Sequence, residues 1–416
     1  MEVKTTTEKT VKKGTIIFWI MAAFILLLHV IAWNSSAFCD WYIAYVFPIW
    51  VNTYGRLTGL FPFSVGELLI LAGLALAASA LFLLPFWAVA EITAAVQSGR
   101  TEKTHTEKKS RTAGRFRKFA RGFYRFFVWT LLIVSLIMTL NCFLLYHAGT
   151  FAEHYLAGGD GAAVSEPEAS LEELVRVYNM VAENCLILSE EVERDENGRA
   201  VYKGSIGADG ERLDMADKAR QLMAQLGKTY EQLDGYYPRP KPLLFSDFMC
   251  QQYMCGYYFP FSMEANYNDV MFVLNLPATM CHELAHLRGF IYEDEANFIA
   301  YLACVQSDDV FFQYAGFLSV LPYLYNDLYE AQRTAPEAYA RVVETTQPVA
   351  LTKQVWADAV FVTDEEWERI NEKAWIDTET VDKAADAFIN TNLKANGISD
   401  GDVSYSRVVD LMLAYY

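Results

Sequence analysis

The chain has 416 residues, of which 53% are hydrophobic, and its formal net charge is −17. Its length allows more than one domain, and its seven cysteines are too few for a scaffold held by disulfide bonds. Residues 1–148 contain 15 Lys and Arg against 7 Asp and Glu, whereas residues 149–416 contain 19 against 44. A basic first part and an acidic second part indicate two different environments.

Three long apolar segments occupy the first part, at about residues 14–33, 65–90 and 126–146. The second holds one charged residue, Glu67 at its edge, and the third holds none. Each reaches or exceeds the roughly 20 residues that a helix needs to cross a bilayer. We therefore expect a membrane domain over residues 1–148, with three transmembrane helices and the lipid bilayer as its partner. The first segment is predicted to stay as an anchor, and a cleavable signal peptide is the alternative.

The distribution of Lys and Arg predicts the orientation of these helices. The connection between the second and third segments carries ten of them, from Arg100 to Arg125, and the N-terminal tail carries four. The connection between the first and second segments carries only Arg56. Because basic connections stay in the cytoplasm, we expect the N-terminus inside the cytoplasmic membrane and everything after about His147 outside it. The basic connection is expected to meet anionic lipid headgroups, and nucleic acid is not an expected partner.

The acidic second part is predicted to be a mostly helical extracytoplasmic domain over residues 170–416, joined to the membrane by a linker over residues 149–169. Apolar positions at helical spacing predict its helices, and β-branched and aromatic residues predict a short strand over residues 269–276. The expected helices cover about residues 171–188, 214–226, 293–304, 364–371 and 380–396, with a last one starting near residue 404.

A further apolar stretch covers residues 310–329 and is interrupted by Gln313, Pro322 and Asp327. It is expected to form a buried pair of helices that packs over the site described next. A fourth transmembrane helix is the alternative, and it would place the C-terminus inside the cell.

A His-Glu-x-x-His motif begins at His282. His282 and His286 are four residues apart, so on a helix both imidazoles leave the same face one turn apart and can reach one zinc ion. Glu283 lies beside them, placed to take a proton from water as a general base. Pro277 suits the first turn of such a helix, and Gly289 suits its left-handed end. A helix with two surface histidines and a solvated glutamate is the alternative without a function.

A catalytic zinc site takes three protein ligands and keeps one position open for water. Because no histidine follows His286, a ligand from further along the chain must be a carboxylate or a weaker group. Glu293, seven residues beyond His286, is the predicted third ligand, and Asp294 and Glu295 are its competitors. Three acidic residues at a helix start also favour the helix dipole without any metal.

Four residues are candidates for a donor that stabilises the transition state: Arg288, Tyr292, Tyr405 and Arg407. The imidazoles also need partners that fix their orientation, and Asn297 or Asp294 is expected to provide this. The sequence does not decide among these side chains.

The motif belongs to a wider pattern, which is most specific at residues 279–290 and 293–302. Other segments of the pattern lie at residues 259–262, 264–266, 307–309 and 392–397. This pattern resembles a family of bacterial membrane proteins known only as domain of unknown function 3810, and the similarity covers most of the chain from about Trp33 onward. The spelling Glu-x-x-Ala-Asn at residues 293–297 also resembles the second metal-binding helix of glutamate-liganded zinc peptidases, in which the first glutamate binds the metal.

The resemblance implies a gluzincin-like metallopeptidase site on an extracytoplasmic domain, and it indicates no substrate. The interval between His286 and Glu293 is shorter than in better-known glutamate-liganded peptidases. This departure leaves the identity of the third ligand open.

These expectations combine into one prediction. The fold is expected to be mainly α, with three N-terminal transmembrane helices followed by a mostly helical, zincin-like α+β domain with a small sheet. The predicted function is hydrolysis of a peptide or protein substrate outside the cytoplasmic membrane by a zinc metallopeptidase, with Zn²⁺ as cofactor. The alternative is a non-catalytic, zinc-stabilised membrane sensor or assembly protein, in which Asp294 or Cys281 closes the site as a fourth ligand. The sequence indicates no oligomeric state.

Overall fold

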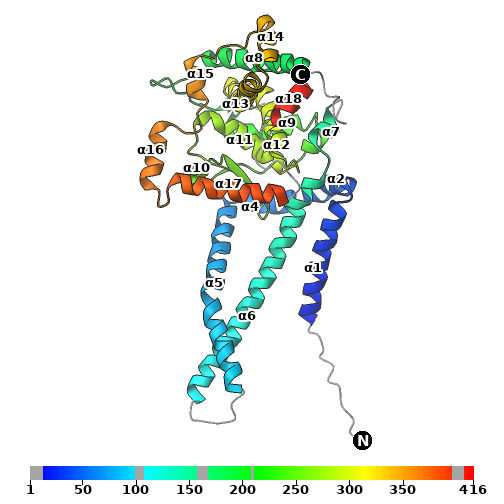
Figure 1. The fold of residues 1–416 in the computed structure, drawn as a ribbon, viewed down its shortest axis with the longest axis vertical. Helices are drawn as coiled ribbons and strands as arrows, with labels where there is room; N and C mark the ends of the chain where they lie inside the picture. Colours follow the sequence, from blue (N-terminus) through cyan, green and yellow to red (C-terminus); the bar gives the residue numbers. More distant parts are fainter. Residues whose placement is uncertain (1–12, 99–106, 157–166, 208–209, 396–406) are drawn as a thin grey trace.

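Three long helices leave one side of a mostly helical body (Figure 1). The computed structural model describes residues 13–98, 107–156, 167–207, 210–395 and 407–416. The long helices are α1 (Lys13–Ala32), α5 (Val65–Ser98) and α6 (Glu107–Met138), and α6 continues into the π-helix η2 (Thr139–Phe143) and the 3-10 turn η3 (Leu145–His147). Each contains a segment long and apolar enough to cross a membrane. Large apolar side chains such as Trp19, Leu74 and Phe82 are exposed along these helices, as suits helices surrounded by lipid. The prediction of three long apolar helices is confirmed.

A set of short helices runs across the ends of the long ones between α1 and α5 (Figure 1). Its members are α2 (Ser36–Tyr45), α3 (Phe47–Trp50), η1 (Val51–Gly55) and α4 (Arg56–Thr58). The Ser35 hydroxyl caps α2 by accepting a hydrogen bond from the Phe38 N–H at 3.2 Å. Tyr42 and Phe47 are buried against the body, whereas Trp41 and Tyr45 are exposed. Such a two-sided segment with aromatic residues is typical of the membrane–water interface.

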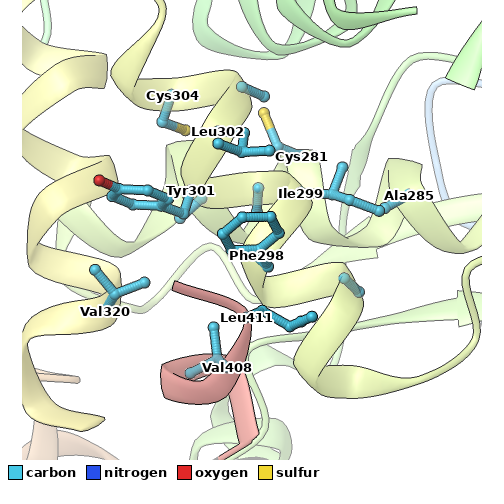
Figure 2. Close-up of a cluster of buried hydrophobic side chains, with 14 of the residues drawn as sticks. Cys281, Ala285, Phe298, Ile299, Tyr301, Leu302, Cys304, Val320, Val408 and Leu411 are labelled. Carbon is cyan, nitrogen blue, oxygen red and sulfur yellow. The ribbon is translucent and has the colours of Figure 1, made fainter. Parts of the chain in front are cut away.

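The core of the body lies where α11 (Leu276–His286) and α12 (Glu293–Val305) pack on each other. Figure 2 shows Phe298 and Leu302 of α12 surrounded by Ala285 of α11, Val320 of α13 and Val408 of α18. Among the helices that surround this pair are α8 (Pro167–Glu191), α9 (Met215–Leu226), α13 (Val310–Thr334) and α18 (Val408–Tyr415). The other helical elements of the body are α7 (Phe151–Tyr155), η4 (Glu231–Leu233), α10 (Ser246–Cys250), η5 (Val273–Asn275), α14 (Pro336–Thr345), α15 (Lys353–Asp358), α16 (Asp364–Lys373) and α17 (Thr378–Ala395).

Two small sheets complete the body. One joins β1 (Ser205–Ile206) to β2 (Arg212–Leu213) as an antiparallel pair. The other has three strands in the order β3-β5-β4, with β3 (Lys241–Pro242) parallel and β4 (Gly256–Phe259) antiparallel to the central β5 (Glu264–Tyr267). The prediction of a mainly helical chain with a small sheet is therefore confirmed.

The prediction of a strand at residues 269–276 is wrong. The Val270 N–H donates to the side chain of Asn268 at 3.1 Å, the Phe272 N–H donates to the Phe361 carbonyl oxygen at 2.9 Å, and η5 then leads into α11. The apolar side chains of this segment pack against the core from a loop. Because burial alone favours the same residue types as a strand does, their composition did not distinguish the two.

The apolar stretch that begins at residue 310 forms one continuous helix, α13, so the prediction of a pair of helices is wrong. Asp309 caps it by accepting hydrogen bonds from the Phe311 and Phe312 N–H groups at 2.8 and 3.3 Å. Pro322 lies inside the helix without ending it. Within the described residues, α13 is not among the helices apolar enough to span a membrane.

Candidate metal centre

The turn between α11 and α12 brings the two ends of the motif together. Pro277 lies in the first turn of α11, and the chain reverses at Gly289, whose φ of 93° is in the left-handed region. A Cβ atom at Gly289 would lie 2.7 Å from the Cγ2 atom of Ile43, so glycine also permits the close approach of α2. After this turn α12 begins at Glu293, next to the end of α11.

His282, His286 and Glu293 converge on one point. The Nε2 atoms of the two histidines are 3.0 Å apart. A carboxylate oxygen of Glu293 lies 3.0 Å from Nε2 of His282, and its other oxygen lies 3.9 Å from Nε2 of His286. Within the described part of the chain, these three residues form the one group of metal-ligating side chains whose ligand atoms all lie within 4.8 Å of one another.

The Nδ1 atom of each imidazole lies at hydrogen-bond distance from an acceptor oxygen. Nδ1 of His286 lies 2.7 Å from the carbonyl oxygen of Phe290, which can only accept a hydrogen bond, so this nitrogen carries the proton. Nδ1 of His282 lies 2.8 Å from the side-chain oxygen of Asn297 and is held in the same way. Both Nε2 atoms therefore face Glu293, and each can offer its lone pair to a metal once it carries no proton.

The charges of the three side chains depend on each other. Burial disfavours a charge on His282, but the adjacent Glu293 carboxylate raises the pKa of His282 to about 9. Burial and the positive charge of His282 lower the pKa of His286 to about 4. Burial opposes ionisation of Glu293, yet the hydrogen bond from His282 lowers its pKa below the usual value. Without a metal, the cluster thus holds one proton between His282 and Glu293 at neutral pH.

Glu283 is buried beside this cluster with a free oxygen atom. The residue is 3% exposed, and its Oε2 atom makes no hydrogen bond with the residues that the structure describes. Burial raises the pKa of Glu283 to about 8, with a smaller opposing effect from His282. A Cβ atom at Gly256 would lie 2.8 Å from Oε1 of Glu283 and 2.4 Å from the carbonyl oxygen of Asn266, so only glycine lets β4 lie this close.

The cluster opens into a cavity of about 850 Å³. One side is formed by Tyr257 and Tyr258 of β4, and another by Tyr323 of α13. Asp382 and Asp386 of α17 also line the cavity. The lining residues that the structure describes include no Lys or Arg, so the cavity carries negative charge around the cluster.

Asp294 and Glu295, the two competitors for the position of third ligand, point away from the histidines. Asp294 faces Arg407, with 3.6 Å between the carboxylate oxygen and the guanidinium nitrogen. Glu295 is buried and accepts a hydrogen bond from the Phe151 N–H at 2.5 Å, and burial raises its pKa to about 8. Of the three consecutive acids, Glu293 is the one that lies beside both histidines.

The candidate donors are also engaged outside the cluster. Arg288 donates to the backbone carbonyl oxygens of Gln232 and Asp234, and the Tyr292 hydroxyl donates to the carbonyl oxygen of Tyr146 at 2.6 Å. Arg407 faces Asp294, and Tyr405 lies outside the described residues. These described side chains hold the surrounding fold together.

Tyr323 is one of the cavity residues that the sequence did not indicate. It lies on α13, where its side chain lines the cavity and contacts Asn297. Burial raises the pKa of its hydroxyl to about 12, and the nearby Cys255 and Glu293 add to the rise. The hydroxyl therefore stays protonated and can donate a hydrogen bond. No local spacing links it to the motif, because only the packing of α13 on α12 brings it there.

The chain matches the model of one protein family over residues 42–413, a family described as proteins of unknown function (DUF3810). The chain belongs to this family. The expected resemblance to it is confirmed, and the family description gives no activity. No curated protein and no solved structure matches this family member. The expected resemblance to zinc peptidases gains no support from these comparisons and stays a prediction that depends on the site.

Proposed function

We propose that the protein is a membrane-anchored, zinc-dependent peptidase that hydrolyses peptide bonds. The observation that supports this is the grouping of His282, His286 and Glu293 within 4.8 Å, at the wall of a cavity of about 850 Å³. The buried carboxylate of Glu283, which has a free oxygen, lines the same cavity. Three ligand groups, a base and space for a peptide thus lie together.

The donor set fits zinc. Two imidazole nitrogens and one carboxylate oxygen are typical ligands of a catalytic zinc ion, which keeps a fourth position open. A non-catalytic site needs a fourth protein ligand, and its two candidates are occupied. Asp294 faces Arg407, and Cys281 lies in the core beside Cys304 (Figure 2). The open arrangement favours the peptidase over the sensor or assembly protein.

Each side chain has a role in the proposed reaction. When bound, zinc supplies Lewis-acid chemistry, since it acidifies water and polarises a carbonyl oxygen. Glu283 takes a proton from the attacking water and passes it to the leaving nitrogen. The first step needs the ionised carboxylate, and the raised pKa suits the second step, because the carboxyl group holds the proton until the nitrogen accepts it. Tyr323 donates its O–H to the developing oxyanion.

The test uses the purified full chain, its zinc content and a peptide library. Glu283→Gln should keep the zinc and lower hydrolysis by at least about 100-fold. His282→Ala should lose the zinc as well as the activity. Glu337→Gln, at an exposed position on α14, serves as the matched control and should change neither. A zinc-free wild-type chain, or hydrolysis by the zinc-loaded Glu283→Gln chain, would overturn the proposal.

The body is further proposed to lie outside the cytoplasmic membrane. Arg115, Arg117 and Lys118 lie near the end of α6 that is remote from the body (Figure 1), as the basic cytoplasmic end of a membrane helix does. The acidic body then faces the extracytoplasmic side.

A further inference from the structure

One wall of the cavity is formed by a helix that is apolar enough to cross a membrane. Met138 and Cys142 line the cavity together with His286 and Glu293. Both lie in the third candidate membrane span, Gly114–His147. The space beside the metal centre therefore reaches the end of a membrane helix directly.

Two hydrogen bonds tie the β4–β5 hairpin to the same helix. The Tyr258 hydroxyl donates to the carbonyl oxygen of Asn141 at 3.0 Å, and the Asn141 side-chain amide donates to the carbonyl oxygen of Pro260 at 2.9 Å. The ring of Tyr258 in turn lies 6.1 Å from the ring of His286, centroid to centroid. A single side chain thus separates a ligand of the proposed metal site from the end of the third span.

The second span is fixed to the sheet as well. Glu264 of β5 accepts hydrogen bonds from the Val65 and Gly66 N–H groups at the start of α5, at 3.1 and 2.7 Å. A Cβ atom at Gly66 would lie 2.8 Å from the Cδ1 atom of Phe259, so glycine lets α5 start directly against β4. The ends of two spans therefore fix the height of the sheet, and with it the metal centre, above the bilayer.

Exposed apolar side chains surround the same end of α5. The Leu244 and Phe245 N–H groups donate to the Glu67 carboxylate in the first turn of α5, at 2.9 and 3.0 Å, which places their loop at the end of the span. We call the exposed group here the seating surface, and its members are Phe61, Phe63, Leu244, Phe245 and Phe248. Aromatic and leucine side chains in this position suit the headgroup region of a bilayer, because the spans already hold them at that level.

Helix α17 places the outer side of the cavity at the same level. Figure 1 shows α17 across the side of the body from which the long helices leave. Its residues Asp382, Asp386 and Ile389 line the cavity. The cavity is therefore bounded by α17 and by the end of the third span, both of which lie next to the membrane.

We propose that the substrate is the juxtamembrane segment of another bilayer-anchored polypeptide, cut while the seating surface rests in the headgroup region of the same leaflet. This inference depends on the proposed peptidase function and adds the class of substrate to it. A chain that leaves the bilayer beside the third span reaches the cavity within a few residues, whereas a soluble peptide gains nothing from this placement.

The test places the full chain and an anchored substrate in the same liposomes. The substrate carries the sequence cut fastest in the peptide library, either about 6 or about 40 residues from a single transmembrane helix. An extended segment of about 6 residues reaches at most ~20 Å, so only a cavity at the bilayer surface can cut it. We expect the near substrate to be cut at least as fast as the far one. We also expect the soluble peptide to be cut at least about tenfold more slowly at equal total concentration.

A matched pair of variants tests the seating surface. Phe245→Asp with Phe248→Asp should slow cleavage of the near substrate by about tenfold and leave cleavage of the soluble peptide unchanged, since a charge there opposes contact with lipid. Tyr329→Asp is the control, because Tyr329 is also exposed but lies on the part of α13 that leads into α14, at the far end of the body (Figure 1).

Several outcomes would overturn the inference. One is that the far substrate is cut and the near substrate is not. Another is that the soluble peptide is cut as fast as the near substrate. If these cuts still depend on Glu283, the proposed function survives and only the class of substrate is wrong. If the zinc-loaded chain cuts none of the three substrates, both proposals fail.

Discussion

Two acceptors decide which way the imidazoles face. The carbonyl oxygen of Phe290 and the side-chain oxygen of Asn297 each fix one Nδ1 atom, and this leaves the Nε2 atoms for a metal. Only the second of these acceptors is a side chain, so it can be removed by substitution.

Asn297→Ala should therefore weaken zinc binding by about 10- to 100-fold, because His282 loses the partner that orients it. Competition with a zinc chelator measures the change. Asn326→Ala is the matched control, since Asn326 lines the same cavity from α13. Equal zinc affinity in the wild type and the Asn297 variant would show that the orientation of His282 is fixed in another way.

Zinc binding should also become tighter as the pH rises from neutral to about 9. Glu293 raises the pKa of His282 to about 9 in the metal-free protein, so a proton occupies the cluster below that pH and must leave when zinc enters. The expected slope is about tenfold in affinity per pH unit for one displaced proton. Calorimetry in buffers of different ionisation enthalpy measures the proton released. A pH-independent affinity over this interval would contradict the shared proton.

Tyr323→Phe should lower kcat by about 100-fold and leave KM and the zinc content nearly unchanged, because only the hydrogen bond to the oxyanion is lost. Steady-state kinetics on the best library peptide separates the two constants. Tyr325→Phe, an exposed neighbour on α13, should have no effect. A parallel loss of zinc would indicate that Tyr323 supports the ligands and is not a donor to substrate.

At the scale of the elements, a buried ion pair joins the sheet to the membrane helices. The Lys241 ammonium group lies 2.5 Å from Glu264 and also donates to the carbonyl oxygens of Thr58 and Phe63. Both charged side chains are almost fully buried. The pair therefore connects β3, β5, α4 and the start of α5 in one network.

Glu264→Gln should destabilise the protein by about 3–5 kcal/mol, because it leaves the buried Lys241 charge without its partner. The double variant Lys241→Met with Glu264→Gln should recover part of this loss. Thermal unfolding in detergent measures both. Glu330→Gln breaks an exposed pair with Arg333 and should leave the free energy of unfolding nearly unchanged, because solvent screens the pair. Equal effects at the buried and the exposed pair would contradict the network's role.

The sequence predicted the elements that depend on local signals. Pro277, Gly289 and the spacing of His282 and His286 describe α11 and its end, and the helices at residues 215–226 and 293–305 follow from their apolar spacing. Segments whose structure depends on distant partners were less predictable. Residues 269–272 form a loop because Asn268 and Phe361 bind its backbone, and the 3-10 helix η5 follows it. Tyr323 reaches the cavity only through helix packing.

At the scale of the whole molecule, the Lys and Arg residues predict which side of the membrane holds the body. A cysteine introduced at Glu337, on α14, should react with a membrane-impermeant maleimide in intact cells, whereas one at Arg115, near the start of α6, should react only after lysis. Both positions are exposed. The unsubstituted chain gives the background of its seven native cysteines. The reverse labelling pattern would place the body in the cytoplasm and overturn the proposed orientation.

The π-helix η2 at the end of α6 has a consequence for how the protein can be divided. Asn141 offers both its backbone carbonyl oxygen and its side-chain amide to the β4–β5 hairpin, and Cys142 lines the cavity from the next position. A truncated chain that begins after residue 148 would lack this wall and leave the Tyr258 hydroxyl and the Pro260 carbonyl oxygen without these partners. We therefore expect anchor and body to fold as one unit and activity to be lost when they are separated.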